Sequence, residues 1–297
     1  MSAILVLGDL NLDIHVQRAR TPPPGHEVRD RIDVSAGGSG GTFARQAVST
    51  GAEVLFAGSV GADLVGDLLK RSLEDAGVRT VLRRIEALPS GTVLSLYTDL
   101  ERSMICSRGA NDGLTETWID DSLFEGIEHV HLSGYMFLSP QQAGAAEQAA
   151  ARAKSRGLSV SADPPSANLI ERFGLADFRV LLPKGCWLFP NLSEGILLSG
   201  EEDPSKIVEQ LAVNFPIGAL TLGEQGALAW DSTGQLRLAS DPLKCTNTTG
   251  AGDAFAGAFV ATYLEKRDLS AATHAGVGAA AHLLQTRSTD RGSPPRT

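Results

Sequence analysis

Short apolar runs alternate with helix-like segments along most of the chain, and this alternation constrains the fold more than any other feature. The first quarter is expected to form strand, helix, strand and helix over residues 4–7, 42–49, 54–60 and 63–76. Continuous apolar runs of this length are typical of strands buried on both faces. The pattern predicts an α/β fold with a mostly parallel sheet covered by helices on both faces. Further strands are expected over residues 130–132, 158–162 and 219–222, and closing helices over residues 251–265 and 270–284.

Two helix starts can be placed from the local sequence. Ser139 precedes Pro140, a residue favoured in the first helical turn, and Gln142 stands three residues after Ser139. Ser and Gln at this spacing form a capping box, in which each side chain bonds a backbone N–H at the other position. We therefore expect Gln142 to cap a helix that begins near residue 140. Asp203, which precedes Pro204, is expected to begin another helix in a similar way.

Residues 11–34 and 91–108 interrupt the alternation, because they carry strand-like patterns without following helices. We interpret them as a small separate β-sheet that acts as a lid. The rest of the chain forms the expected α/β core, over residues 1–10, 35–90 and 109–286. Residues 287–297, with two prolines and mixed charge, are expected to be a partly mobile tail.

Composition excludes several classes of partner. The 297 residues include 26 Lys and Arg against 35 Asp and Glu, a net charge of −9. A surface this acidic argues against binding to nucleic acid or to a membrane surface, since phosphate groups require a basic face. The three cysteines show no C-x-x-C spacing, and the first residues lack a signal-peptide pattern. These features predict a soluble, cytoplasmic protein.

The segment from Thr248 to Phe255 carries the strongest chemical signal. Gly250 and Gly252 let the backbone turn sharply, and the apolar run that follows them predicts a helix. The unpaired N–H groups at a helix N-terminus, together with the helix dipole, favour a phosphate group there. Asp253 then fits a base that takes a proton from an attacking hydroxyl, so the pairing indicates phosphoryl transfer. Alternatively, Asp253 only caps a glycine-rich turn.

Polar residues follow two apolar strands on the side expected to hold an acceptor molecule. Asn11 and Asp13 come after the first strand and could face a polyol, whereas an isolated pattern of this kind is more often a strand-end turn with a solvated Asp. Gly37 and Gly38 precede a helix and could let the backbone approach a sugar. Glycine-rich loops are common, so this second signal is weak when taken alone.

Two later clusters also stand at strand ends. Asn191 and Glu194 follow an apolar run and could hold phosphate and hydrated Mg²⁺, or they could simply begin a helix. Residues 221–226 close another strand and could contact a nucleotide, or form a hairpin turn. His129 and His131 alternate along a strand and are expected to be surface or hydrogen-bonded residues, not metal ligands.

Absent motifs narrow the choice of nucleotide chemistry. The P-loop pattern G-x-x-x-x-G-K-[ST] does not occur, and neither H-E-x-x-H nor a cysteine cluster marks a zinc site. Phe255 occupies the position at which G-x-G-x-x-G would need its third glycine. A dinucleotide site at the Gly250 turn is therefore disfavoured.

The clusters, taken in this order, resemble the ribokinase-like (pfkB) carbohydrate kinase family. The matching motifs span nearly the whole chain, at residues 8–13, 37–38, 190–194, 221–223 and 248–253. The resemblance implies a ribokinase-like three-layer αβα sandwich with a mostly parallel central sheet and a small β-sheet lid. It also implies ATP and Mg²⁺ as cofactors, nucleotide binding by the α/β core, and a homodimer formed through the lid.

The resemblance implies a role for each matched residue. Asp253 would be the catalytic base, and the amides of Gly250, Ala251 and Gly252 would form the anion hole. The residues implied to bind the remaining ligands are Asn11, Asp13, Gly37, Gly38 and Thr42 for the sugar, Asn191, Thr221, Gly223 and Gly226 for the nucleotide, and Glu194 for Mg²⁺ through water.

Three departures from the family pattern affect these implications. Asn247 stands where an acid helps several members to bind a monovalent cation, so potassium activation is not expected. Thr42 replaces an Asn, and its shorter hydroxyl cannot make the same pair of amide bonds. Ser39 replaces the Lys typical of ribokinase, and only residues 133–137, which contain no acid, follow the central strand. Free ribose is therefore not expected to be the best substrate.

The sequence thus predicts an ATP-dependent kinase that phosphorylates a hydroxyl of a sugar or sugar-like molecule. The alternative on the same fold is a nucleoside kinase, whose base would need an apolar slot supplied by Tyr97, Tyr135 or Phe137. A different class remains open, a non-catalytic sugar or nucleotide sensor, because a fold alone does not define a function.

Overall fold

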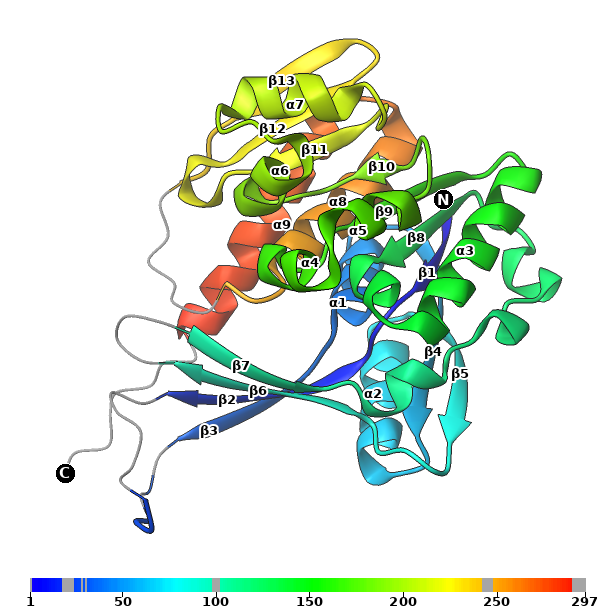
Figure 1. Cartoon of the computed structure of the whole chain (residues 1–297), viewed down its shortest axis with the longest axis vertical. Helices are drawn as coiled ribbons and strands as arrows, with labels where there is room; N and C mark the ends of the chain where they lie inside the picture. The colour runs from blue at the N-terminus through cyan, green and yellow to red at the C-terminus, as the bar shows by residue number, and fades with distance from the viewer. Residues whose placement is uncertain are drawn as a thin grey trace.

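The computed structural model of the protein describes residues 2–17, 24–27, 29, 31–97, 102–241 and 248–289. Two β-sheets and a set of helices make up this part of the chain (Figure 1). The large sheet consists, from edge to edge, of β13 (Gly234–Leu238), β12 (Ala227–Asp231), β11 (Gly218–Thr221), β10 (Trp187–Leu188), β9 (Ser159–Asp163), β8 (His129–Ser133), β1 (Ala3–Leu7), β4 (Glu53–Gly61) and β5 (Arg79–Ile85). The small sheet consists of β3 (Ile32–Gly37), β2 (Asn11–Gln17), β6 (Gly91–Tyr97) and β7 (Arg102–Ser107).

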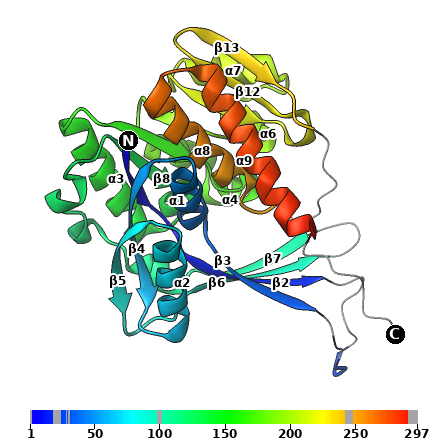
Figure 2. The ribbon, with the colours of Figure 1, turned by 180° about the vertical axis from the view of Figure 1, so that it is seen from behind.

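The large sheet is parallel from β5 to β11, and only β12 and β13 run antiparallel to their neighbours. Helices cover both of its faces (Figure 2). The α-helices are α1 (Ser39–Ser49), α2 (Leu64–Asp75), α3 (Pro140–Ser155), α4 (Ala167–Phe173), α5 (Leu175–Leu181), α6 (Leu192–Ser199), α7 (Pro204–Ala212), α8 (Ala251–Lys266) and α9 (Leu269–Thr289). Short 3₁₀ helices are η1 (Gly109–Gly113), η2 (Glu116–Trp118), η3 (Asp121–Phe124), η4 (Gly134–Leu138) and η5 (Gly223–Gln225).

Two apolar cores lie on opposite faces of the large sheet. Side chains of β1 alternate between them, because successive residues of a strand point to opposite faces. Leu5 and Leu7 join the core under α3 to α7, while Ile4 and Val6 join the core under α1, α2, α8 and α9. The mostly parallel sheet buried on both faces is the architecture that the sequence predicts.

The helix caps test the local sequence signals. Asp63 caps α2 through the Gly66 N–H at 2.7 Å, and Asp203 caps α7 as predicted. The capping box predicted at α3 is wrong. Ser139 makes no side-chain cap bond, and Gln142 is fully buried and donates to Asp9 instead. A tertiary partner therefore outweighs the local one at this helix.

The start of α1 differs from the prediction, because the helix begins at Ser39 and includes the second pair of glycines. Gly38 precedes it with φ of 90°, a conformation that strongly favours glycine. A Cβ on Gly40 would lie 2.9 Å from the Gly8 Cα, which is closer than real contacts allow. These glycines therefore let α1 approach the end of β1 closely, a packing requirement that helix propensity does not reveal.

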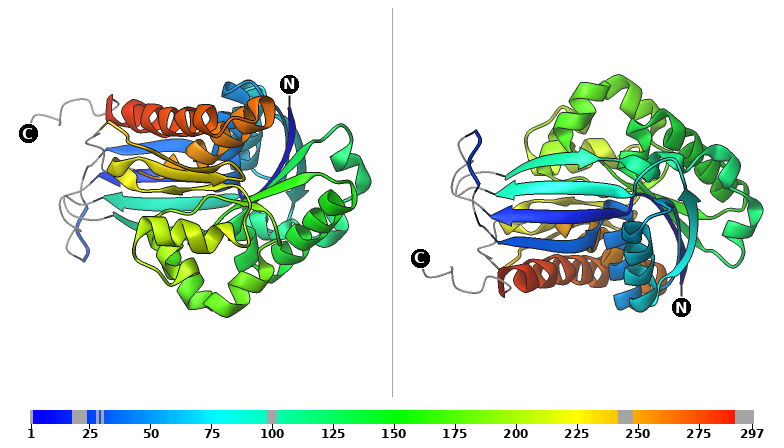
Figure 3. Two further views of the ribbon diagram at one scale, coloured as in Figure 1. Left: turned by 90° about the horizontal axis from the view of Figure 1, so that it is seen from above. Right: turned by 90° about the horizontal axis from the view of Figure 1, so that it is seen from below.

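The small sheet projects from the α/β body as a separate layer (Figure 3). A buried polar cluster fastens its base to the body. Asp9, in the connection from β1 to β2, accepts hydrogen bonds from Arg108 at 2.9 and 3.3 Å and from Gln142 at 3.1 Å. Arg108 also bonds Gln142 and pairs with Asp112. Burial raises the pKa of Asp9, and the neighbouring Arg108 charge opposes that rise.

Asn111 completes this cluster and is fully buried. Its Oδ1 accepts the Leu10 N–H at 3.0 Å, and its Nδ2 donates to the Asn11 Oδ1 at 2.8 Å and to the Arg108 carbonyl at 3.0 Å. One amide therefore joins the two connections that enter and leave the small sheet.

Among the helices of the described ranges, none has the length and apolar character that a bilayer crossing needs.

We expect Asn111→Ala to lower the free energy of unfolding by about 2 to 3 kcal/mol, because it leaves buried polar partners unsatisfied. Urea unfolding followed by circular dichroism measures this loss. Asn214→Ala, at an exposed amide, is the matched control and should stay within about 0.5 kcal/mol of the wild type. Equal stability of the two variants would show that the Asn111 bonds are not needed.

Candidate functional site

The N-terminus of α8 forms the centre of the site. Gly250 precedes the helix with φ of 76°, so the residue before the first turn is in the left-handed conformation and carries no capping side chain. The first N–H groups of a helix have no partner within the helix, although the Ala251 N–H already donates to the Thr248 carbonyl at 3.2 Å. A Cβ atom added to Gly252 would have no neighbouring atom within 4 Å. The predicted helix and its open N-terminal turn are thus both present.

Asp253 lies in the first turn of α8 and is half-buried. Its carboxyl group contacts Asp163, at the end of β9, and the hydroxyl of Ser39 at the start of α1. Desolvation, together with the negative charge of Asp163, raises the pKa of Asp253 well above its usual range. A carboxyl group with a raised proton affinity is suited to accept a proton from a hydroxyl.

Asp163 is the residue of this site that the sequence analysis missed. It is buried and is the last residue of β9, a position close to that of Asp9, which stands just after the end of β1. The rule that polar residues at strand ends form ligand sites in parallel sheets could have identified it. The sequence analysis sought an acid after β8 and found none, whereas the neighbouring strand supplies one.

Asn191 and Glu194 form a capping box at the start of α6. The Asn191 Oδ1 accepts the Glu194 N–H at 3.0 Å, and the Glu194 carboxylate accepts the Asn191 N–H at 2.9 Å. The helix-start interpretation is therefore correct, but it does not exclude a ligand role. Burial raises the pKa of Glu194 to about 8, and the Asp163 charge adds to this rise. A buried carboxyl group of this kind gains from a cation placed beside it.

The residues predicted to bind the acceptor come from the small sheet and from the start of α1. Asp13 is buried, and its carboxylate occupies the space that a Cβ on Gly37 would need. Thr42 lies beside the N-terminus of α8: a Cβ atom added to Gly250 would be 3.3 Å from the Thr42 Cγ2. Asn11 has its Oδ1 committed to Asn111. The structure thus brings Thr42 to the phosphate side of the site and leaves only part of the Asn11 amide for a ligand.

The residues predicted to lie along the nucleotide form the next part of the same edge. Asn191 pairs with Thr221 as an isolated parallel bridge, and the Thr221 N–H donates to the Pro190 carbonyl at 2.9 Å. Gly223 and Gly226 have φ of 59° and 86°, and they turn the chain from β11 into antiparallel β12. The hairpin interpretation is therefore correct here as well. The prediction that potassium does not activate the protein rests on Asn247, which lies outside the described residues.

A groove of about 260 Å³ runs between the end of β13 and α9. Its lining mixes small and apolar residues with Asp241, His274 and Gln285. Its lining includes Leu238, Ser240, His274, Val277 and Ala281.

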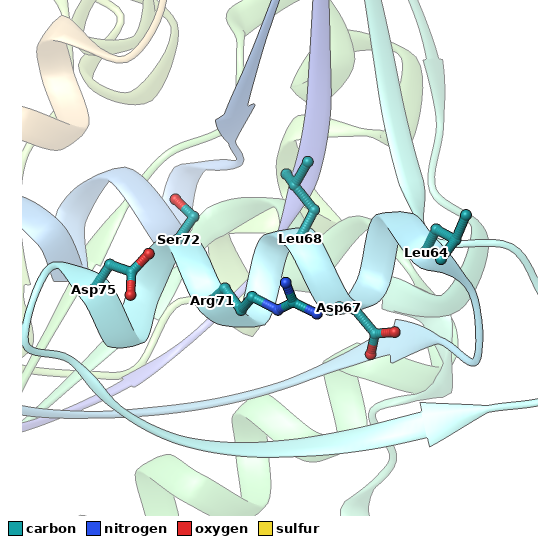
Figure 4. A pocket seen from close by; sticks show the side chains of 6 residues that line it. All are labelled: Leu64, Asp67, Leu68, Arg71, Ser72 and Asp75. Carbon is teal, nitrogen blue, oxygen red and sulfur yellow. The ribbon is translucent and has the colours of Figure 1, made fainter.

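A second hollow, of about 440 Å³, lies on the outer surface of α2 (Figure 4). Its lining comes entirely from one helix and includes Leu64 and Leu68, which are 86% and 48% exposed. None of the site residues described above borders it. It therefore belongs to the outer surface and not to the candidate active site.

His129 and His131 are predicted to be surface or hydrogen-bonded residues, and the structure excludes the first alternative because both are fully buried. Both rings form hydrogen bonds with serines of β9, although Nε2 of His131 has no hydrogen-bond partner in the described part of the chain. Among the described residues, no group of three or more His, Cys, Asp or Glu side chains could hold a metal ion by itself.

Comparison with known proteins gives matches over almost the whole chain. The model of the pfkB family carbohydrate kinases matches residues 1–296. Ribokinase of Bacillus subtilis (strain 168) is 26% identical over 298 residues, which cover 100% of this chain and 97% of that protein.

Solved structures match at lower identity. Adenosine kinase from Sinorhizobium meliloti superposes with a TM-score of 0.85 at 22% identity and covers 96% of this chain and 94% of its own. A putative ribokinase II from E. coli, solved in complex with ATP and Mg²⁺, has a TM-score of 0.83 at 21% identity and covers 96% and 93% of the two chains. These matches confirm the ribokinase-like α/β fold.

We expect the Glu194 carboxyl group to make the protein less stable as pH rises. The folded protein retains a proton on Glu194 up to a pH of about 8, whereas the unfolded chain releases it near the ordinary value of 4.5. The folded state therefore binds more protons between these values, and the stabilising contribution present below 4.5 is lost as pH rises to about 8.

In Glu194→Gln this dependence should disappear, so the variant should gain roughly 4 kcal/mol in free energy of unfolding relative to the wild type between pH 5 and pH 8.5. Urea unfolding at the two pH values, without ligands, measures the difference. Glu171→Gln, at an exposed carboxylate, is the control. Parallel pH profiles for the wild type and Glu194→Gln would contradict the raised pKa.

Proposed function

This chain belongs to the pfkB family of carbohydrate kinases, and we propose that it transfers the γ-phosphoryl group of ATP to a hydroxyl of a sugar or sugar-like acceptor through Asp253. The observation that carries this proposal is the position of Asp253. Its carboxyl group has a raised pKa and lies in the first turn of a helix whose N-terminus is open. A base and a phosphate-binding turn are thereby combined in four consecutive residues.

The acceptor lies between the small sheet and α8 in this proposal. Asp13 accepts hydrogen bonds from its hydroxyl groups, and the backbone at Gly37 and Gly38 lets the acceptor approach closely. The lid residues, 11–34 and 91–108, cover the acceptor and exclude water. Asp253 takes the proton of the attacking hydroxyl, while the N–H groups at residues 250–252 stabilise the negative charge of the transferring group.

Mg²⁺ and ATP fit the acidic end of this site. Glu194 is buried, and burial raises its pKa to about 8. No basic residue of the described chain is among the main groups that act on this pKa. It would hold the ion through water, since Mg²⁺ keeps several waters. When bound, the ion supplies positive charge to the phosphate groups. Thr221, Gly223 and Gly226 lie along the nucleotide, and the groove beside α9 receives the adenine ring.

A nucleoside acceptor is the second candidate, and Tyr135 favours it. Its hydroxyl contacts the Ser166 hydroxyl at 3.1 Å, and the charges of Asp253, Glu194 and Asp163 all act on it. Its ring therefore lies near the proposed reaction centre and could stack on a base. Phe137 cannot serve, because it is 1% exposed and packs against Phe178 in the core.

Asp253→Asn tests the proposed base. We expect the variant to fold normally and to lose about 10²- to 10⁴-fold in turnover, since Asn cannot accept the proton. ADP release from ATP and Mg²⁺ with pentoses, hexoses, sugar acids, sugar phosphates and nucleosides measures both the rate and the acceptor class. Asp177→Asn, at an exposed carboxylate, is the matched control.

Two results would contradict the proposal. Wild-type turnover in Asp253→Asn would remove this residue from the mechanism. Binding of ATP and an acceptor without ADP release would instead favour the sensor hypothesis.

The small sheet also supports a homodimer. One row of apolar side chains crosses all four strands on its outer face, formed by Val34, Ile14, Leu94 and Ile105. Val34 and Ile105 are 57% and 63% exposed. The opposite face carries Asp13 and belongs to the acceptor site. We propose that a second copy of this chain covers the outer face, since a contiguous exposed apolar patch is typical of an interaction surface.

Ile105→Glu is expected to convert the dimer to a monomer, because it buries a charge in the proposed interface. Size-exclusion chromatography with light scattering measures the molar mass over a range of concentrations. Val180→Glu places the same charge at another apolar position, 83% exposed on α5, and should leave the mass unchanged. A wild-type protein that is monomeric at every concentration would refute this assembly.

A further inference from the structure

A file of buried polar side chains runs along two neighbouring strands of the large sheet and ends at Asp253. The file is formed by His129 and His131 of β8 and by Ser159, Ser161 and Asp163 of β9. In the strand register His129 is opposite Ser159, His131 is opposite Ser161, and Ser133 is opposite Asp163. The family resemblance and the proposed function give no role to any of these five residues.

Hydrogen bonds connect the file from Ser159 to His131, and a polar contact joins His131 to Asp163. The His129 ring nitrogens lie 2.7 Å from the hydroxyls of Ser159 and Ser161. The Ser161 hydroxyl also lies 2.9 Å from Nδ1 of His131, whose Nε2 is 3.3 Å from the Asp163 Oδ1. His131 in turn stacks on Phe43, with ring centroids 3.6 Å apart. The ring is therefore fixed in position, and so is its contact with Asp163.

Asp163 has two hydrogen-bond donors and one further polar neighbour. Ser39 of α1 donates to its Oδ2 at 2.9 Å, the Gly134 N–H of η4 donates to its Oδ1 at 3.3 Å, and Nε2 of His131 on β8 lies 3.3 Å from the same Oδ1. The hydroxyl of Ser133 donates to Ser39 at 3.0 Å and orients it. Because these donors favour the charged form, they lower the pKa of Asp163 despite its burial.

Asp253 has the opposite environment. Its carboxyl group is desolvated and contacts the negative Asp163. Among its principal interactions, only the hydrogen bond with the Ser39 hydroxyl favours the charged form. Two carboxylates in contact cannot both be ionised without a large repulsion, so such a pair retains one proton. The donors around Asp163 place the negative charge there and leave the proton on Asp253.

We propose that Asp163 is a positioning residue that holds the Asp253 carboxyl group against it and makes Asp253 a stronger proton acceptor in the transfer reaction. This proposal rests on the proposed function, in which Asp253 is the base. In the reactive state both carboxyl groups are ionised. The acceptor O–H bond then breaks and its proton moves to Asp253, while the new O–P bond forms and the bond between the γ-phosphoryl group and ADP breaks. The proton relieves the repulsion between the two carboxylates, which favours the transfer.

The other charged and titratable groups around the pair determine how it responds to pH. The negative charge of Glu194 on α6 raises the proton affinity of Asp253, and the charge of Asp163 raises that of Glu194. Tyr135 of η4 is held neutral, since burial raises its pKa to about 12. His129 is farther along the file, and burial holds its pKa well below the usual range. His131 is the remaining titratable group in contact with Asp163.

The first experiment uses the free protein and therefore does not depend on kinase activity. Protein labelled with ¹³C-aspartate is titrated by NMR of the carboxyl carbons, without ATP or acceptor. We expect one protonated aspartate signal at pH 7 that is lost in Asp253→Asn, and that titrates at least about one pH unit lower in Asp163→Asn. An Asp253 signal that titrates near its ordinary value in the wild-type protein would overturn the proposal.

The second experiment compares the pH profiles of kcat/KM. The acid limb is the part of the profile in which kcat/KM falls as pH decreases, because the base becomes protonated. In Asp163→Asn this limb should move to lower pH by about one unit or more, because the negative charge beside Asp253 is gone. In Ser39→Ala it should move to higher pH, because the pair loses a donor that favours its charged form. Asp177→Asn should leave the limb in place.

Opposite shifts in the two variants would support the positioning role, since a merely structural effect lowers the rate without moving the limb in two directions. An unmoved limb in Asp163→Asn would overturn the proposal. If no acceptor supports turnover, the proposed function fails, and the NMR titration still decides whether Asp163 controls the proton on Asp253. Should Asp163→Asn not fold, the shift in Ser39→Ala decides the question in the same two assays.

Discussion

Desolvation of carboxyl groups at one edge of the large sheet is the constraint on which the site depends. Asp163 and Glu194 are buried there, and Asp253 lies beside them in the first turn of α8. Burying a charge costs several kcal/mol unless donors or a cation compensate it. Asp163 has two hydrogen-bond donors and the His131 ring beside it, whereas Glu194 and Asp253 instead acquire raised proton affinities. The two apolar cores on either side of the sheet supply the stability that tolerates this arrangement.

Close approach of backbone segments places these groups within reach of one another. Gly8 and Gly40 bring the start of α1 against the end of β1, and this contact carries the Ser39 hydroxyl to Asp163. A side chain on either glycine would push α1 away from the sheet and lengthen the Ser39 contact. The glycine-rich segment before α1 therefore serves the packing of the site at least as directly as it could serve the binding of a sugar.

Strong local signals allowed much of this structure to be predicted from the sequence. Asp63, Asp203 and the turn at Gly250 each begin a helix where the residues indicate one, because the bonds that fix them lie within three residues. Signals that depend on distant partners failed. Gln142 matches a capping box, yet a residue 133 positions away in the chain, Asp9, takes its side chain. The burial of His131 likewise depends on β9 and Phe43, which local patterns cannot place.

The register of the small sheet links assembly to chemistry. Asp13 and Ile14 are neighbours in β2 and therefore point to opposite faces, one to the acceptor site and one to the outer apolar row. A slip of one residue would expose the apolar row to the acceptor and carry the carboxylate to the outer surface. The Asn111 amide prevents such a slip at the base of β2, because it bonds Leu10 and Asn11 together with the chain leaving β7. A buried polar cluster outside the proposed reaction centre thus determines which face of the small sheet is turned to the proposed acceptor site.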